Sequence, residues 1–237
     1  PFTTIDANRG VTHVRTRCPC LDRDQRCGVD RCHDGTRYVP VELLDVAGLV
    51  PGAHEGRGLG NQFLDELTNA DAILNVVDAS GATNRTGDPV EPGSHDPLDD
   101  VDFVETEMDL WLAGVIADNW ERVERTSRSP EFDLDEALTA MLTGVGATEA
   151  DVASVLREVE YPADPKRWTD ADREALARAI RRQTKPMVVV ANKADRASTE
   201  TLDRLTSEPD KPVVPTTADG ELALRRAAEA GVVAYDP

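Results

Sequence analysis

The sequence predicts an α/β fold in which a mostly parallel, doubly wound sheet is interrupted by an all-helical insert. Short apolar runs of strand type end in polar residues at 72–78 and 186–192, and a long region of helical patterning separates them. A further helical pattern follows the last expected strand, at 221–230. Strands that alternate with helices are typical of a parallel sheet covered by helices.

The N-terminal part predicts two strands joined by a cysteine-bearing loop. Residues 11–17 alternate between apolar and polar side chains, and residues 37–45 predict the second strand. The intervening residues 18–35 are polar and carry all four cysteines, so we expect a loop there. The glycine-rich segment 48–60 is too flexible for regular structure, and residues 60–69 predict a short helix.

The middle of the chain predicts the insert. Residues 81–100 are rich in Gly, Pro, Asp and Ser, which indicates a loop or a boundary, and helical patterning extends from about 97 to 184. A helix is expected at 134–142, and Thr148-Glu-Ala-Asp151 and Thr169-Asp-Ala-Asp172 have the form of capping boxes that begin two more. The first helix of the insert has an apolar face made of Val104, Met108, Trp111, Val115 and Val123.

The α/β pattern resumes after the insert. The near-continuous apolar runs at 72–78 and 186–192 predict buried strands. Residues 212–217 predict a weaker strand, and the helix at 221–230 has Gly231 in the position of a C-terminal cap.

Composition restricts the class of protein. The net charge is −19 and the sequence pI about 4.5, yet 40% of the residues are hydrophobic, which argues against disorder. Such acidity favours a cytoplasmic protein of a halophile and argues against broad or sequence-specific nucleic-acid binding. No apolar run is long enough to span a membrane. The first residues have neither an initiator Met nor a signal peptide, so we expect an internal point of a longer protein.

The most informative motif is Asn192-Lys193-Ala194-Asp195, which follows a predicted strand. Guanine presents two adjacent donors that one carboxylate can accept together, and adenine does not, so Asp195 would discriminate between the two bases. Asn192 would connect the loop to its neighbours, and the stem of Lys193 would cover a face of the base. A simple surface turn is the alternative for an isolated motif of this length.

Three weaker motifs occur in an order consistent with the first one. Asp45-Val-Ala-Gly48 ends a strand, where Asp45 could hold a water on Mg²⁺ and the Gly48 amide could approach a phosphate. A hydroxyl of Thr3 or Thr4 could bind Mg²⁺. Thr216-Thr217-Ala218 follows the last strand, where a backbone N–H could donate to guanine O6.

The four cysteines have the spacing Cys-x-Cys-x₆-Cys-x₄-Cys. Four thiolates can enclose Zn²⁺ and stiffen a polar loop, although the spacing is not that of a standard zinc finger. Free or redox-active thiols and disulfides are the two other interpretations. These residues are Cys18, Cys20, Cys27 and Cys32.

Together, the segments 1–5, 45–64 and 192–195 closely resemble the archaeal branch of the Obg/YchF GTPases. The resemblance implies the G domain of a P-loop NTPase with bound GTP or GDP and Mg²⁺, a helical insert, and a role at the ribosome. It implies that 1–96 and 185–237 are the two parts of the G domain and that 97–184 is the insert.

The resemblance also assigns roles by position. Thr4 would be the switch I ligand of Mg²⁺, and Asp45 and Gly48 would belong to switch II. Asn192, Lys193 and Asp195 would recognise the base, with Thr217 and Ala218 beside them. Because the base motif is intact, GTP is favoured over ATP.

Two departures from the family pattern affect the expected activity. Leu49 stands where Ras-like GTPases have a water-orienting Gln, and His54 or Glu55 could supply a polar group instead. No Gly-x-x-x-x-Gly-Lys-[Ser/Thr] occurs in the sequence, and the family's C-terminal TGS domain is also absent from it. We therefore expect these 237 residues not to hydrolyse GTP alone. A non-enzymatic module that docks through the insert and the cysteine loop is the competing hypothesis.

Overall fold

The computed structural model describes residues 8–23, 27–28, 30–46, 52, 66, 68–159 and 161–235. The chain forms two compact units. One is Phe2–Gly48, and the other is Leu49–Pro237 together with Pro1. Within the described residues, every helix is too short or too polar to cross a lipid bilayer.

The first unit is a long antiparallel ribbon. Strand β1 (Asn8–Arg17) pairs with β3 (Thr36–Asp45) over its whole length, from Asn8 opposite Asp45 to Arg17 opposite Thr36. The short strand β2 (Cys32–His33) pairs with the start of β3, and the 3₁₀ turn η1 (Pro19–Asp22) follows β1. Both strands expected in this part of the chain are confirmed.

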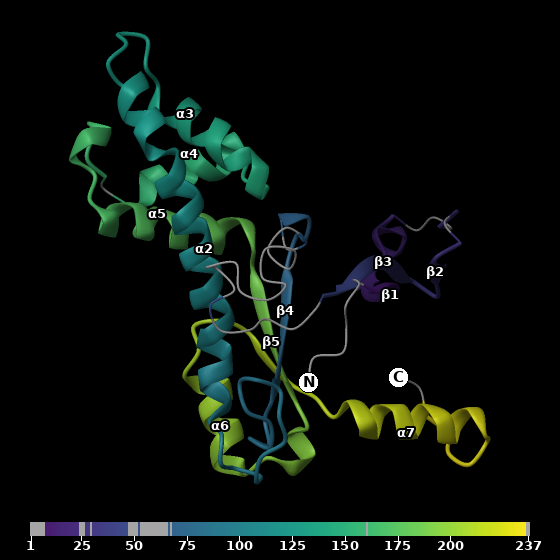
Figure 1. Ribbon diagram of the computed structural model, residues 1–237. Helices are drawn as coiled ribbons and strands as arrows, with labels where there is room; N and C mark the ends of the chain where they lie inside the picture. Colours follow the sequence, from purple (N-terminus) through teal and green to yellow (C-terminus); the bar gives the residue numbers. More distant parts are fainter. Residues whose placement is uncertain are drawn as a thin grey trace. The chain divides into compact units, whose positions relative to one another are not determined.

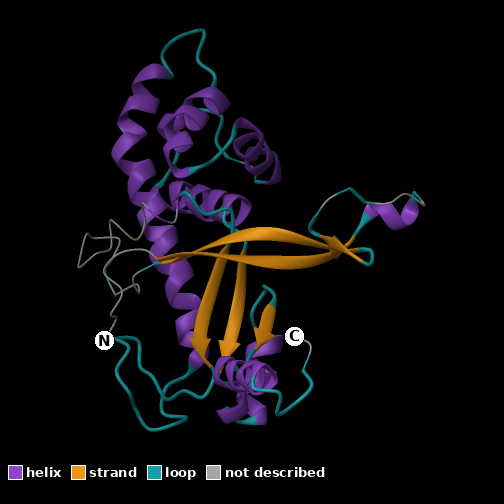
Figure 2. Cartoon of the chain, turned by 90° about the vertical axis from the view of Figure 1, so that its right-hand side faces the viewer, coloured by secondary structure: helices purple, strands orange, loops and turns teal. Residues whose placement is uncertain are grey.

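The second unit contains a parallel sheet in the order β4-β5-β6 (Figure 2). Its strands are β4 (Ile73–Asp78), β5 (Met187–Asn192) and β6 (Val213–Pro215). The register places Asp78 beside Asn192, so the polar residues that end β4 and β5 lie at one edge of the sheet. This arrangement confirms the expected α/β fold with a parallel sheet.

The sheet buries alternate side chains. Val77 and Val189 point into a core that also holds Val101 and Leu205, while Leu74 is 54% exposed and Val76 is 62% exposed. The buried strand expected at 72–78 is therefore buried on one face, and the face that carries Leu74 and Val76 is exposed within the described residues. A continuous apolar run does not reveal whether the second face of a strand is covered.

Helix α2 (Pro97–Thr126) extends from the sheet into the insert (Figure 1). Near its start, Val101 packs against the sheet, and from Leu112 onward α2 contributes to a separate helical core. Helix α2 begins at residue 97, where the boundary of the insert was expected. Its side chains contribute to both cores. The buried residues of the helical core that lie outside α2 are Leu138, Leu142, Val145, Ala147, Val152, Val155, Trp168, Leu176, Ala177 and Ile180.

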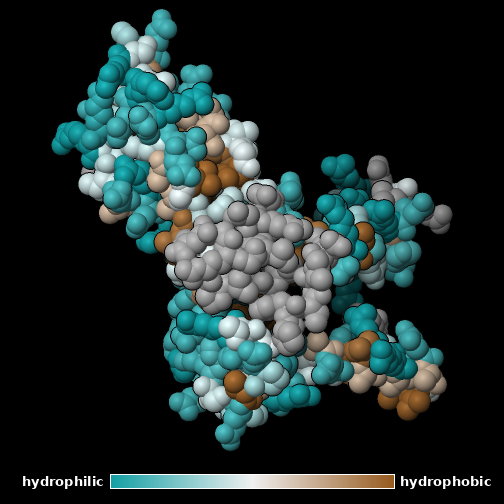
Figure 3. Space-filling model, in the orientation of Figure 1, coloured by the Kyte–Doolittle hydropathy of each residue, from teal (hydrophilic) through white to brown (hydrophobic). Residues whose placement is uncertain are grey.

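The remaining insert helices begin where the sequence predicts. Helix α3 is Leu134–Leu142, and α4 (Glu149–Glu158) and α5 (Asp170–Thr184) each begin with the expected capping box. The 3₁₀ turns η3 (Thr143–Val145) and η4 (Pro165–Arg167) connect them. Their outer surface is mainly hydrophilic in Figure 3, which fits helices that bury a single apolar face.

Two C-terminal helices complete the second unit. Helix α6 (Thr199–Ser207) contributes Leu205 to the sheet core and was not anticipated from the sequence. Helix α7 (Ala218–Glu229) begins three residues before the expected start at 221, and Gly231 follows it with a φ of +72°. That left-handed conformation is the one expected of a glycine that ends a helix.

Candidate functional site

The loop after β5 makes a tight turn at Lys193. This residue has φ 59° and ψ 32°, in the left-handed region that side chains other than glycine rarely adopt. It directs the chain from β5 into the 3₁₀ turn η5 (Ala194–Arg196), which places Asp195 just beyond the edge of the sheet. Backbone strain of this kind is retained only where the surrounding structure holds it, which is common in ligand-binding loops.

Asn192 connects this loop to the loop that follows β6. Its Oδ1 accepts a hydrogen bond from the backbone N–H of Ala218 at 3.1 Å and lies 3.5 Å from the hydroxyl of Thr216. The backbone N–H of Ala194 donates to the carbonyl oxygen of Thr216 at 3.0 Å. Thr217, the residue before α7, lies half-buried between these contacts. The structure thus brings together all five residues that the sequence indicated for base recognition.

Asp78 is a further member of this site that sequence reasoning missed. Its Oδ2 accepts hydrogen bonds from Lys193 Nζ and from the hydroxyl of Thr83, each at 2.7 Å. Its Oδ1 accepts from the hydroxyl and backbone N–H of Ser80 at 2.5 and 3.0 Å. Burial of this carboxyl group opposes ionisation, but the hydrogen bonds from Lys193 and the two hydroxyls outweigh burial and lower the Asp78 pKa to about 2. The sequence feature that could have identified Asp78 is its place as the polar last residue of β4, which the register sets beside Asn192.

The carboxylate of Asp195 is open to solvent. Its side chain is 46% exposed, and the ion pair recorded for it within the described residues is a long one, 3.8 Å from Arg196 Nε. Both oxygens can therefore accept hydrogen bonds from a ligand. By contrast, the side chains of Asn192 and Asp78 already accept hydrogen bonds from groups within the protein.

The residues expected to bind Mg²⁺ are described only in part. Asp45 is the exposed last residue of β3. Its carboxylate is a hard oxygen donor of the kind that Mg²⁺ prefers, so this residue fits the ion. Thr4 and Gly48 lie outside the described residues, as do Leu49, His54 and Glu55.

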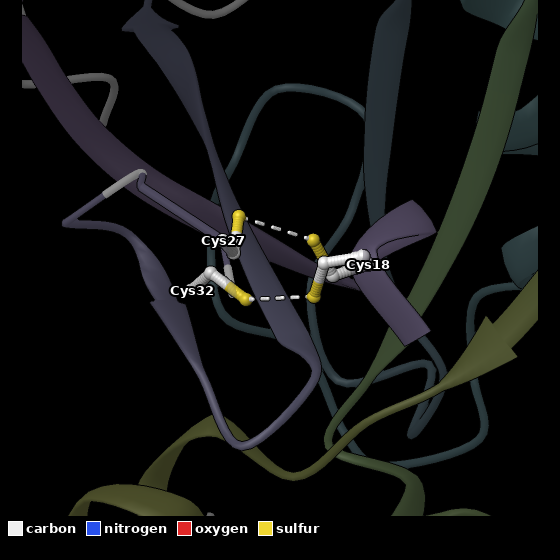
Figure 4. A group of neighbouring side chains, drawn as sticks. Cys18, Cys27 and Cys32 are labelled. Carbon is white, nitrogen blue, oxygen red and sulfur yellow. Dashed lines mark hydrogen bonds between the residues drawn. The ribbon is translucent and has the colours of Figure 1, made fainter. Parts of the chain in front are cut away.

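The four cysteines converge at the end of the ribbon where Arg17 pairs with Thr36, and Figure 4 shows three of them pointing toward one another. We call Cys18, Cys20, Cys27 and Cys32 the four-cysteine cluster. All of its Sγ atoms lie within 4.8 Å of one another, and all four thiols are free. Cys18 Sγ lies 3.5 Å from Cys27 Sγ, and Cys20 Sγ lies 3.8 Å from Cys32 Sγ.

The thiols of this cluster differ in acidity. A hydrogen bond from the backbone N–H of Cys20 lowers the pKa of Cys18 to about 6, although burial opposes the shift. Burial and hydrogen bonds with the other thiols raise the pKa of Cys32 to about 12. Sharing a hydrogen bond with Cys18 also raises the pKa of Cys20. Cys18 therefore ionises more readily than Cys20 and Cys32.

Two family models match the chain. The 50S ribosome-binding GTPase model matches residues 1–103. The model of the Obg-like GTPase YGR210-like, G4 motif-containing domain matches residues 190–237, the part that contains Asn192, Asp195 and Ala218.

Relatives cover nearly the whole chain. A GTP-binding protein of Methanocaldococcus jannaschii is 43% identical over 98% of this chain and 59% of its own length. The crystal structure of a GTP-binding protein from Pyrococcus horikoshii OT3 superposes with a TM-score of 0.81 at 36% identity, over 97% of this chain and 63% of that one. The ribosome-binding ATPase YchF of Bacillus subtilis is 29% identical over 81% of this chain and 48% of its own length.

The chain therefore spans about three-fifths of the length of its first curated relative, 59%. The matches favour a nucleotide-binding protein over the non-enzymatic module. Together with the paired loops at the ends of β5 and β6, they show that the chain belongs to the Obg/YchF family of GTPases.

Proposed function

We propose that the protein to which these residues belong is a GTP-dependent switch, and that the loops after β5 and β6 form its guanine site. The observation that carries the proposal is the bond between Asn192 Oδ1 and the Ala218 N–H. This hydrogen bond fixes the loop after β5 to the loop after β6, while the carboxylate of Asp195 stays exposed to a ligand. Preorganised polar groups of this kind favour binding, since little ordering remains to be done.

In this site, Asp195 accepts hydrogen bonds from the ring N–H and the amino group of guanine. Adenine presents no such pair, so its binding leaves the carboxylate without partners. The aliphatic stem of Lys193 covers one face of the base while its ammonium group stays on Asp78. The Ala218 N–H is shared with Asn192, so donation to guanine O6 requires that hydrogen bond to become bifurcated or to be exchanged.

The family resemblance assigns the Mg²⁺ and phosphate contacts of the parent protein to Thr4, Asp45 and Gly48. Thr4 would bind the ion, Asp45 would hold one of its waters, and the Gly48 amide would donate to the terminal phosphate. When bound, Mg²⁺ neutralises charge on the phosphate oxygens. In this proposal residues 1–96 and 185–237 are the two parts of the G domain, and 97–184 are an insert that does not contact the nucleotide.

We further propose a cytoplasmic protein with a ribosome-linked role, and the names of relatives support the link to the ribosome. The Bacillus subtilis relative is named a ribosome-binding ATPase, and one matching family model is described as a 50S ribosome-binding GTPase. Co-sedimentation of the gene product with 50S subunits tests this role. We expect more protein in the pellet with a non-hydrolysable GTP analogue than with GDP, and equal amounts would contradict a nucleotide-dependent switch.

Base selection is the sharpest test of the site itself. We would measure the affinities of the gene product that carries these residues for GTP, ATP and xanthosine triphosphate. The loss of two charge-assisted hydrogen bonds in Asp195→Ala should weaken GTP binding about 100-fold or more and leave ATP binding nearly unchanged. Asp195→Asn should improve binding of xanthosine triphosphate, whose carbonyl oxygen replaces the guanine amino group.

Asp203→Asn is the matched control, because Asp203 is an exposed carboxylate on α6. It should leave all three affinities unchanged. A preference for GTP over ATP that survives the loss of the Asp195 carboxylate would overturn the assignment.

A further inference from the structure

We propose that the four-cysteine cluster binds one zinc ion, which closes the end of the β1–β3 ribbon. Zn–S bonds of about 2.3 Å in a tetrahedron place the sulfur atoms about 3.8 Å apart. The two closest recorded pairs are 3.5 and 3.8 Å apart, and all four Sγ atoms lie within 4.8 Å of one another. Small side-chain rotations therefore suffice to enclose an ion.

The cluster joins segments that the chain would otherwise leave separate. Cys18 directly follows β1, and Cys32 is the first residue of β2, opposite Arg37 on β3. The backbone N–H of Cys18 donates to the carbonyl oxygen of Gly35 at 2.7 Å, which closes the loop around the sulfur atoms. Four ligands drawn from both sides of the loop make the arrangement a clip across the end of the ribbon.

The ribbon needs such a clip because it has almost no apolar core. Among the described residues of Phe2–Gly48, Cys18 is the one that is fully buried, and the whole of β1 is exposed. Two-stranded ribbons are at best marginally stable by themselves. Small units without a hydrophobic core commonly obtain their folding free energy from metal ions or disulfides.

The surrounding charge suits a thiolate-bound metal. Zn²⁺ with four thiolates carries a formal charge of −2, and the guanidinium group of Arg37 lies 3.8 Å from Cys27 Sγ. An N–H donor to a ligand sulfur is the usual outer contact of a thiolate–zinc site. Two disulfides carry no negative charge that the guanidinium group of Arg37 could stabilise.

The same test distinguishes two other states of the cluster, a pair of disulfides and a bound iron ion. Disulfides need sulfur atoms about 2.05 Å apart, and the nearest pairs are 3.5 and 3.8 Å apart. Their formation would link Cys18 with Cys27 and Cys20 with Cys32. A single iron ion can also bind four thiolates, and its colour distinguishes it from zinc.

The test begins with the gene product purified in reductant without chelator. Elemental analysis should give one zinc per chain, and exchange with Co²⁺ should produce the visible absorption of a tetrahedral thiolate site. Each single Cys→Ser substitution should abolish stoichiometric zinc. Leu21→Ala, a change in the same loop that removes no ligand, should keep it.

A second measurement covers variants that fail to fold. Chelation of the metal from the wild-type protein should accelerate amide exchange in β1 and β3, and added Zn²⁺ should restore protection. Because the proposal does not depend on nucleotide binding, exchange in β5 should not change. A protein that neither contains zinc nor takes up Co²⁺, that holds stoichiometric iron, or whose mass shows two disulfides in reductant would overturn the proposal.

Discussion

Lys193 and Asp78 form an ion pair, 2.7 Å from Nζ to Oδ2, that joins the loop after β5 to the end of β4. The Asp78 side chain is 10% exposed and that of Lys193 is 39% exposed, so the pair lies at the margin of the protein. The backbone N–H of Ala79 also donates to the carbonyl oxygen of Asn192 at 2.9 Å. The loop after β5 is therefore fixed to the end of β4 by a charged contact and by a backbone hydrogen bond.

Replacement of the Lys193 ammonium group should loosen this connection. We expect Lys193→Met to lower the free energy of unfolding by about 1–2 kcal/mol, since Asp78 keeps its hydroxyl donors and water reaches the pair. Urea denaturation measures the effect, and a double-mutant cycle with Asp78→Asn isolates the coupling. Lys166→Met, at an exposed lysine in the insert, is the control and should cost less than about 0.5 kcal/mol.

Acid should weaken the contribution of Asp78 in a defined pH range. Its folded-state pKa is about 2, below the ordinary value of 3.8, so its stabilisation is complete above about pH 4 and is lost as the pH falls toward 2. The full contribution is about 2 kcal/mol, and about half of it should be lost at pH 3. The stability difference between the wild type and Asp78→Asn should therefore narrow by about 1 kcal/mol between pH 6 and pH 3. A constant difference would show that Asp78 has an ordinary pKa.

Loss of the Asn192 side chain should uncouple the two loops. In Asn192→Ala the Ala218 N–H loses its acceptor at 3.1 Å, and we expect faster exchange of that amide and a stability loss of about 1 kcal/mol. The backbone bond from Ala194 to Thr216 remains, so the amide of Ala194 should stay protected. Hydrogen exchange at single-residue resolution separates the two. Asn119→Ala, at an exposed position of α2, should leave both amides unchanged.

The sharpest contrast in stability concerns two adjacent arginines on α5. Arg181 is 5% exposed and pairs with Asp109 and Glu105 of α2, each at 2.7 Å. Arg181→Met should cost about 3 kcal/mol, because the two carboxylates lose their buried partner. Arg182 is 56% exposed and pairs with the exposed Asp210 at 3.0 Å, so Arg182→Met should cost about 0–1 kcal/mol. Thermal or urea unfolding of both variants tests the prediction, which similar losses would contradict.

Much of the fold is readable because local signals and tertiary packing agree. The capping boxes at Thr148 and Thr169 begin α4 and α5, since a hydroxyl and a carboxylate three residues apart satisfy the same free amides in a peptide and in a protein. Helix α6 was missed because it is short, 9 residues, and mostly polar, although Leu202 and Leu205 both pack on the sheet core. So short a helix has few apolar positions from which a helical period can be recognised.

The site was readable from sequence where its residues form short motifs that follow a strand. Asn192 and Asp195 belong to one short motif, whereas the part played by Asp78 depends on the register that places it beside Asn192. The cysteine spacing predicted a local cluster, but only the structure shows four sulfur atoms within 4.8 Å. The roles of Thr4, Asp45 and Gly48 stay predictions, because two of these residues lie outside the described residues.

The continuity of α2 has a consequence for how this unit unfolds. Helix α2 has 30 residues, which corresponds to a length of about 45 Å, and it contributes buried side chains to both cores. Val101 and Ile116 therefore place the sheet core and the helical core on one cooperative element. We expect heating to melt both cores in one transition, so a destabilising substitution in the helical core should lower the melting temperature of the sheet as well.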